Sequence, residues 1–277
     1  MSARGVLRVA RIGLNTVDPE ALAAFFVDAL GFDRRPSSAT TVQLGDVPVD
    51  LHRVAPSAPA GPTDVPGWSP LFQHFAIIVS DMTAAMRRLT TSTRWTPITI
   101  DGPQRLPARN GGVTAFKFRD PDGHPLELLA LPDGSTTASP SVRIDHSAIS
   151  VAEVARSLAF YADLGLHVAT RSLNIGQAQQ RLDAIVDAEV DVIGLATDTS
   201  ATPHIELLGY RGDHDRSGIE VAAVDAISAT RLVLTVADRN ALAEIGARHA
   251  DAVVHRSDKS LLLRDPDGHL LELVVEG

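Results

Sequence analysis

Four segments of the chain share one pattern of apolar and polar positions. Each is a short run in which apolar residues alternate with polar ones and which ends at an Asp or Glu: 12–18, 75–81, 148–153 and 232–238. A period of two residues is typical of a strand with one buried face. The acidic residue suits a helix start, and Ala- and Leu-rich helical spacing follows it. The pattern therefore predicts a strand followed by a helix, four times over.

Short strand-like runs follow each predicted helix and complete a repeat. Examples are TTVQL, VPVDLHRV, VTAFKFRD and DVIGLAT. The segment RDPDGHPLELLAL at 119–131 returns as RDPDGHLLELVVE at 264–276, and 22–32 resembles 158–166. DPDG between two strand-like runs is a strong hairpin turn. We expect four strand–helix–strand–strand–strand modules, an α+β fold and not a parallel doubly wound sheet.

The repeat also predicts the domain organisation. Two modules fall in each half of the chain, 7–132 and 142–277, and a connector at 133–141 rich in Gly, Ser and Thr joins them. A length of 277 residues, of which 44% are hydrophobic, can bury the cores of two domains.

Charge and composition exclude several function classes. The net charge of −9 argues against binding a nucleic-acid phosphate backbone. Without cysteine, disulfides, thiolate metal sites and Cys nucleophiles are all excluded, so any metal must be held by His and carboxylates. We find no apolar run long enough to span a membrane and no signal-peptide pattern at the N-terminus, and expect a cytoplasmic protein without a membrane partner.

FYADLGL at 160–166 and the RDPDGH-x-LEL segments together resemble the vicinal oxygen chelate superfamily. This superfamily contains glyoxalase I, bleomycin resistance proteins and extradiol dioxygenases. The resemblance covers nearly the whole chain and implies two tandem domains, in which βαβββ modules pair into cupped mixed sheets around a metal. Its ligands come from the first and last strands of each module.

Aligning the four modules gives candidate ligand positions. The first strands contribute one position each and the last strands another: Arg11, His74, His146 and Arg231, then Asp50, Glu127, Glu206 and Glu272. Pairing modules two and three would gather His74, Glu127, His146 and Glu206, two imidazoles and two carboxylates, around one divalent ion. Iron, manganese, cobalt, nickel and zinc all suit such a set.

Modules one and four contribute Arg11, Asp50, Arg231 and Glu272, which cannot hold a metal in the same way. Two guanidinium groups carry the formal charge of one divalent ion. We therefore expect a degenerate second site in which Arg11 and Arg231 form buried ion pairs with Asp50 and Glu272.

Modules two and three also carry insertions, around 98–112 and 171–190. These predict a lid or substrate-recognition loop, with Arg105 and Arg109 as candidate anion contacts, although an ordinary surface loop is an equal alternative. His204, on the same strand face as Glu206, is a further substrate candidate that we expect at the rim. His124 and His269 are expected to be solvent-facing turn residues.

These residues favour a metal-dependent, glyoxalase-like lyase or isomerase acting on a small carbonyl substrate. The resemblance implies Glu127 as the base, with Glu206 as the alternative. A non-haem Fe(II) extradiol-type dioxygenase is the second hypothesis, and a non-catalytic small-molecule binding protein is the third. Nothing in the sequence indicates glutathione, and either a monomer or a homodimer is compatible with the fusion.

Overall fold

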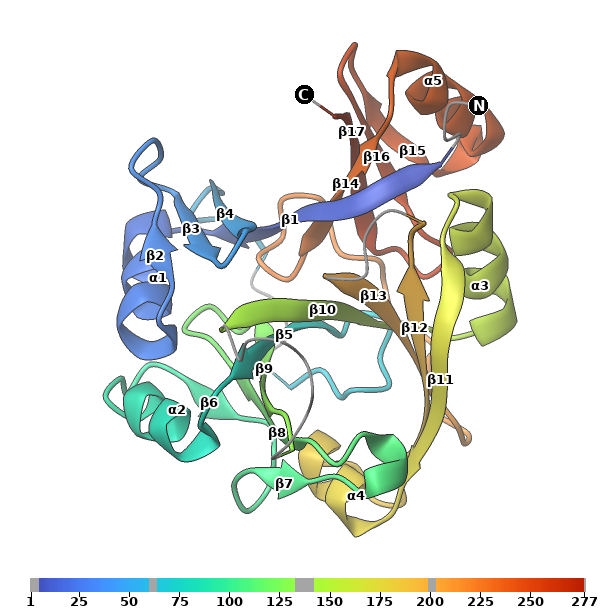
Figure 1. The fold of residues 1–277 in the computed structure, drawn as a ribbon. Coiled ribbons are helices and arrows are strands. Elements are labelled where there is room, and N and C mark those ends of the chain that lie inside the picture. The colour runs from blue at the N-terminus through green and yellow to red at the C-terminus, as the bar shows by residue number, and fades with distance from the viewer. Residues whose placement is uncertain (1–4, 60–63, 133–141, 199–202, 277) are drawn as a thin grey trace.

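The computed structural model describes residues 5–59, 64–132, 142–198 and 203–276. The predicted connector at 133–141 lies outside this part of the chain. The described strands form two mixed sheets, here called sheet A and sheet B, with the helices arranged around them (Figure 1). The expected α+β class with cupped sheets is confirmed.

Sheet A joins the first and last quarters of the chain. Its strands run in the order β15-β16-β17-β14-β1-β4-β3-β2. Their bounds are β1 (Val6–Thr16), β2 (Asp33–Arg34), β3 (Thr41–Leu44), β4 (Val47–Arg53), β14 (Arg231–Val236), β15 (Val253–Arg256), β16 (Ser260–Arg264) and β17 (Leu270–Val275).

Sheet B joins the second and third quarters. Its order is β11-β12-β13-β10-β5-β9-β8-β6, and β7 pairs with β8. The bounds are β5 (Gln73–Val79), β6 (Thr96–Pro97), β7 (Gln104–Arg105), β8 (Thr114–Arg119), β9 (Pro125–Ala130), β10 (Arg143–Ser150), β11 (His167–Ile175), β12 (Glu189–Ala196) and β13 (His204–Tyr210).

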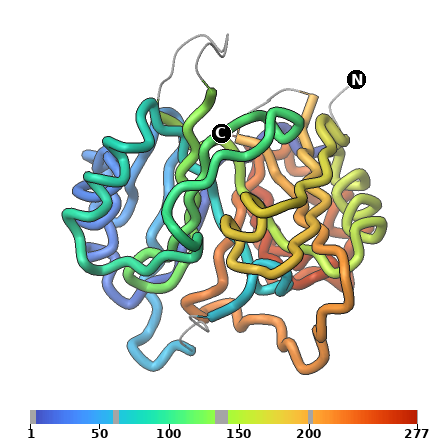
Figure 2. Tube along the Cα trace, turned by 90° about the horizontal axis from the view of Figure 1, so that it is seen from below, coloured from blue at the N-terminus to red at the C-terminus, as the bar shows by residue number. Residues whose placement is uncertain are grey.

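The sheet order confirms that modules two and three pair, as do modules one and four. At the centre of sheet B, β5 runs antiparallel to β10, and at the centre of sheet A, β1 runs antiparallel to β14. Within each module the first strand lies parallel to the last: β1 to β4, β5 to β9, β10 to β13 and β14 to β17. Figure 2 shows the first half of the chain, blue to green, gathered beside the second half, so each sheet spans both halves.

Helices follow the first strand of each module, as the pattern predicts. The helical segments are α1 (Pro19–Phe25), η1 (Phe26–Leu30), α2 (Met82–Leu89), η2 (Ala108–Asn110), α3 (Val154–Asp163), α4 (Gln177–Asp183), α5 (Arg239–Arg248) and η3 (Ala250–Ala252). The expected acidic caps are present: a backbone N–H of the first turn donates to a side chain in every module, at Asp18, Asp81, Glu153 and Asp238. Such caps satisfy N–H groups that have no partner within the helix.

The two sheets share one apolar core, to which the helix-side faces of all four modules contribute. In the first half, the ring of Phe26, just after α1, stacks with that of Phe75 on β5 at 6.2 Å. In the second half, the buried Tyr161 of α3 donates to Asp265 in module four at 3.0 Å. Neighbouring modules in the chain are thus joined through this core, while the opposite faces of the sheets remain available for a site.

The DPDGH turns contradict one expectation, because His124 and His269 are buried and not solvent-facing. His124 faces Asp120 through Nδ1 at 2.8 Å and the carbonyl of Ile227 through Nε2 at 3.0 Å. The Nε2 atom of His269 faces the carbonyl of Ser150 at 2.9 Å. Each ring therefore links its turn to a distant module: His124 reaches the other half of the chain, and His269 reaches module three within the second half. Strand periodicity does not reveal such long-range contacts.

The His124 contacts generate a stability prediction. Burial alone would lower the pKa of His124, but Asp120 raises it above the ordinary value of 6.5. Two acceptors around one ring favour the doubly protonated imidazolium. Because the folded-state pKa is raised, the stabilisation is fully present below about pH 6.5 and is lost as the pH rises through the folded-state pKa.

We expect His124→Gln to lower the free energy of unfolding by about 1–3 kcal/mol at pH 6. The difference from the unmodified chain should shrink as the pH rises above about 6.5. Urea unfolding at several pH values measures this. Asp120→Asn keeps an acceptor for the backbone of the turn and should remove the same pH-dependent part of the free energy of unfolding. If His124→Gln lowers this free energy equally at every pH, His124 is not stabilised as an imidazolium by Asp120.

Candidate metal centre

Four side chains of sheet B surround two small residues on one face of the sheet. Ala76 on β5 lies opposite Glu127 on β9 and His146 on β10. Ala148 on β10 lies opposite His74 on β5 and Glu206 on β13. This register places all four predicted ligand positions on adjacent central strands, and we call this face the ligand cup.

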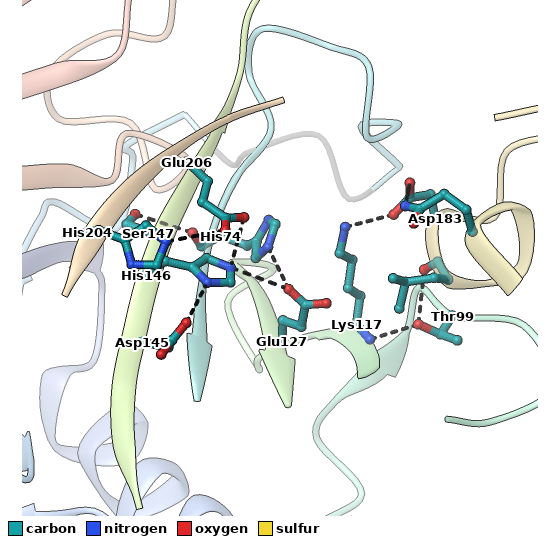
Figure 3. Close-up of polar contacts among 12 residues, drawn as sticks. His74, Thr99, Lys117, Glu127, Asp145, His146, Ser147, Asp183, His204 and Glu206 are labelled. Carbon is teal, nitrogen blue, oxygen red and sulfur yellow. Dashed lines mark hydrogen bonds and ion pairs between the residues drawn. The ribbon is translucent and has the colours of Figure 1, made fainter. Parts of the chain in front are cut away.

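The side chains converge within the ligand cup (Figure 3). His74 Nε2 lies 3.0 Å from Glu127 Oε2, and His146 Nε2 lies 3.7 Å from the same oxygen. Glu206 Oε2 is 3.5 Å from His146 Nε2. His74, Glu127 and His146 are buried, and one potential ligand atom from each lies within 4.8 Å of the others. The structure therefore brings the four sequence-predicted residues together, with three of them forming the tighter group.

The donor set fits a divalent cation. His146 Nδ1 lies 3.2 Å from Asp145 Oδ2, which favours the tautomer with its proton on Nδ1. Its Nε2 atom is buried, faces the two glutamates and makes no hydrogen bond of normal geometry. A carboxylate behind an imidazole is the usual way to orient a histidine ligand and raise its basicity. Sequence reasoning missed Asp145, although an acidic residue directly before a candidate ligand was a visible signal.

The charges of the cluster depend on one another. Burial alone would raise the pKa of Glu127, but Lys117, His146 and His74 hold it well below the usual value. Burial, followed by Lys117, lowers the pKa of His74. Burial would also lower the pKa of His146, but Glu206, Asp145 and Glu127 raise it well above the usual value. The cup thus keeps Glu127 as a carboxylate and His74 as a neutral imidazole, the forms that bind a metal ion, whereas His146 carries a proton that a bound metal ion would displace.

A cavity of about 430 Å³ opens above the cluster, and both insertions line it. Asn110 donates to the carbonyl of Leu173 at 3.2 Å, and the N–H of Ile100 donates to the carbonyl of Arg181 at 2.8 Å. The two insertions therefore contact each other and together form part of the cavity wall.

The substrate candidates take different positions. Arg109 lines the cavity, whereas Arg105 is exposed on β7 and does not. His204 is 19% exposed at its side chain and does not line the cavity. Its Nε2 is 3.3 Å from Glu206 Oε1 on the same strand, and its ring is 5.5 Å from that of His146 on the neighbouring strand. It therefore contacts the cluster without facing the cavity.

A buried ion pair in the cavity wall was missed by sequence reasoning. Lys117 on β8 lies opposite Glu127, and its Nζ is 2.7 Å from Asp183 Oδ1 at the end of α4. Burial alone would lower the pKa of Lys117, but Asp183, followed by Glu127, raises it, so the ammonium stays charged. The pair joins residues 66 positions apart, and no local pattern predicts such a contact.

Sheet A carries the equivalent positions without a metal-binding set. Gly13 lies opposite Asp50 and Arg231, and Val233 lies opposite Arg11 and Glu272, the same register as in the ligand cup. We call this face the arginine cup. Within the described residues, the groups of His and carboxylates close enough for a metal lie on sheet B alone.

The expected buried ion pairs of the arginine cup are wrong in two respects. Arg11 Nη1 does lie 3.3 Å from Asp50 Oδ2, but the Arg11 side chain is 46% exposed. In the described part of the chain, Arg231 and Glu272 form no ion pair. Arg231 instead lies across Gly13, where a Cβ would meet its Cγ at 2.6 Å and His52 Nε2 at 2.8 Å.

Known proteins that are similar to this chain share the tandem architecture. The Glyoxalase/Bleomycin resistance protein/Dioxygenase superfamily model matches residues 8–128 and 143–273. Glyoxalase I from Zea mays is similar in structure, with a TM-score of 0.62 at 15% identity, covering 97% of this chain and 92% of that one. A mutant of the same maize enzyme gives a TM-score of 0.64 at 16% identity, with the same coverage.

A putative dioxygenase from Bacillus subtilis has a TM-score of 0.56 at 12% identity, covering 98% of this chain and 86% of that one. No curated protein sequence matches the chain. Across the described residues, no helix is long and apolar enough to cross a membrane. Identities this low show the fold alone, but the family match extends over both halves. The chain belongs to the glyoxalase/bleomycin resistance/dioxygenase superfamily.

Proposed function

We propose that the ligand cup binds one divalent metal ion and that the protein is a glyoxalase-like lyase or isomerase. Its substrate is a small carbonyl compound that presents two neighbouring oxygens. The observation that carries the proposal is the buried cluster of His74, Glu127 and His146 at the floor of a cavity large enough for a small molecule. A non-catalytic binding protein would have no need to keep such a set buried together.

The metal ion, when bound, supplies Lewis-acid polarisation of the substrate carbonyl and so acidifies the neighbouring C–H bond. The residues of the ligand cup have separate roles in binding the metal ion and in orienting its ligands. His74, Glu127 and His146 would hold the ion, with Asp145 orienting His146. The two insertions, which line part of the cavity, would reduce the access of water to a bound substrate.

The contacts favour Glu206 over Glu127 as the proton-transferring base. Glu127 lies between both imidazoles, where it serves as a ligand. Glu206 lies outside the tight group, lines the cavity and is 19% exposed at its side chain. A general base must reach the substrate proton, and a carboxylate at the edge of the metal group is better placed to do so. The resemblance had implied Glu127 for this role.

A ring-cleaving dioxygenase is the second candidate, and one observation favours it. The tight group consists of two imidazoles and one carboxylate, the set typical of non-haem Fe(II) oxygenases. Extradiol enzymes of the family usually take their ligands from the C-terminal pair of modules, where this chain has Arg231. The second carboxylate, Glu206, makes the isomerase the better supported function.

The first prediction of this proposal concerns metal affinity. We expect His146→Gln and Glu127→Gln to weaken Ni²⁺ binding by more than the roughly 10–100-fold that losing an outer-shell partner costs. Calorimetric titration of the metal-free protein measures this. Glu272→Gln, at the equivalent position of the arginine cup, is the matched control and should bind like the unmodified chain. Equal affinity in all the variants would remove the ligand cup as the metal site.

The second prediction separates the two glutamates. We expect Glu206→Gln to keep most of the metal affinity but to lower kcat about 10²–10⁴-fold. The metal-loaded protein is assayed with hemithioacetals of methylglyoxal and several thiols, and oxygen uptake with catechols is followed in parallel. Full turnover in Glu206→Gln would return the base to Glu127. Oxygen consumption without isomerisation would establish the dioxygenase.

A further inference from the structure

Lysine is rare in this chain. Lys117 and Lys259 are its only lysines, and arginine supplies the other basic residues. Lys259 is exposed, whereas Lys117 is 4% exposed and lines the cavity beside the ligand cup. A lysine ammonium is a compact charge with freely rotating donors, unlike the planar fork of arginine.

Asp183 holds the Lys117 side chain in one place. Its Oδ1 accepts from Lys117 Nζ at 2.7 Å, while its Oδ2 accepts from Gln179 at 2.6 Å. The backbone is tied as well: the N–H of Lys117 donates to Thr99 Oγ1 at 2.7 Å, and Thr99 donates to the carbonyl of Leu182 at 3.0 Å. Figure 3 shows this chain of contacts beside Glu127.

The segment that carries Asp183 is held in an unfavourable backbone conformation. Among the described residues, the non-glycine positions with positive φ are Asp101, Ala184 and Asp187, and all three lie in the two insertions. Ala184, at φ 55°, follows Asp183 directly. Such residues are retained where the surroundings impose them, and they gather at functional sites. Here the strained residue sets the end of α4 against Lys117.

A purely structural role does not account for this arrangement. A buried ion pair adds little to stability compared with apolar residues of the same volume. An ammonium has three donors, and in the described structure Asp183 is its one hydrogen-bond acceptor. Lys117 lines the cavity and Asp183 does not, so the remaining donors are available to a bound molecule.

We propose that Lys117 is a specificity-determining residue that donates a hydrogen bond to a third oxygen of the substrate, and that Asp183 is its positioning residue. The inference rests on the proposed function, in which two other oxygens face the metal. Because Asp183 neutralises Lys117, the third oxygen belongs to a hydroxyl or carbonyl group and not to a carboxylate. The substrate is therefore a small, oxygen-rich carbonyl compound.

The test uses hydroxamates, which chelate metals through two oxygens. Acetohydroxamate, propionohydroxamate and butyrohydroxamate are compared with their ω-hydroxy counterparts by calorimetry on the Ni²⁺-loaded protein. We expect the hydroxyl to strengthen binding about tenfold at the chain length that reaches Lys117. Lys117→Met should abolish this preference while the affinity for Ni²⁺ remains, and Asp183→Asn should reduce it.

Lys259→Met is the matched control and should behave like the unmodified chain. If Lys117→Met does not fold because Asp183 is left unpaired, the double variant Lys117→Met with Asp183→Asn, which removes both charges, is tested in its place. If Lys117 only holds α4 in place, Lys117→Met will lower the thermal stability but leave the preference for the ω-hydroxy hydroxamates unchanged. That result would overturn the proposal. So would a lack of this preference in the unmodified chain. Failure of the unmodified chain to bind Ni²⁺ would instead overturn the proposed function, and this inference with it.

Discussion

The antiparallel pairing of β5 with β10 is the constraint on which the candidate site depends. Its register sets Ala76 opposite His146 and Ala148 opposite His74. The parallel neighbours β9 and β13 then add Glu127 and Glu206 at the same level. A slip by one residue would turn the histidines to the other face of the sheet, since side chains alternate along a strand. The candidate metal site is thus a consequence of how the two halves of the chain pair.

Much of this could be predicted from the sequence, because the relevant information is repeated. The four acidic helix caps and the alternating strands fix the modules, and matching positions in the modules identify His74, Glu127, His146 and Glu206 as one group. Two imidazoles in modules two and three, against two arginines in modules one and four, indicate which modules pair. The observed register reproduces this alignment in both cups.

Two of the misses share a physical cause, since each is a contact between segments that no local pattern relates. His124 reaches Ile227, 103 residues away, and Lys117 pairs with Asp183, 66 residues away, in the cavity wall. A turn motif is expected to be exposed unless a distant partner covers it. The arginine cup was misjudged for a different reason: charge counting predicted ion pairs, whereas the space above Gly13 lets Arg231 lie across the sheet.

The two cups show how one scaffold comes to hold one site. Ala76 and Gly13 occupy equivalent positions, and both are small because side chains from neighbouring strands meet above them. In the ligand cup, that space lies beneath a cavity of about 430 Å³ lined in part by the insertions. In the arginine cup, Arg231 and His52 fill it. The same scaffold therefore carries a cavity over the ligand cup and a packed arginine over the arginine cup, and this difference follows from the side chains at the first-strand positions, His74 and His146 in one cup against Arg11 and Arg231 in the other.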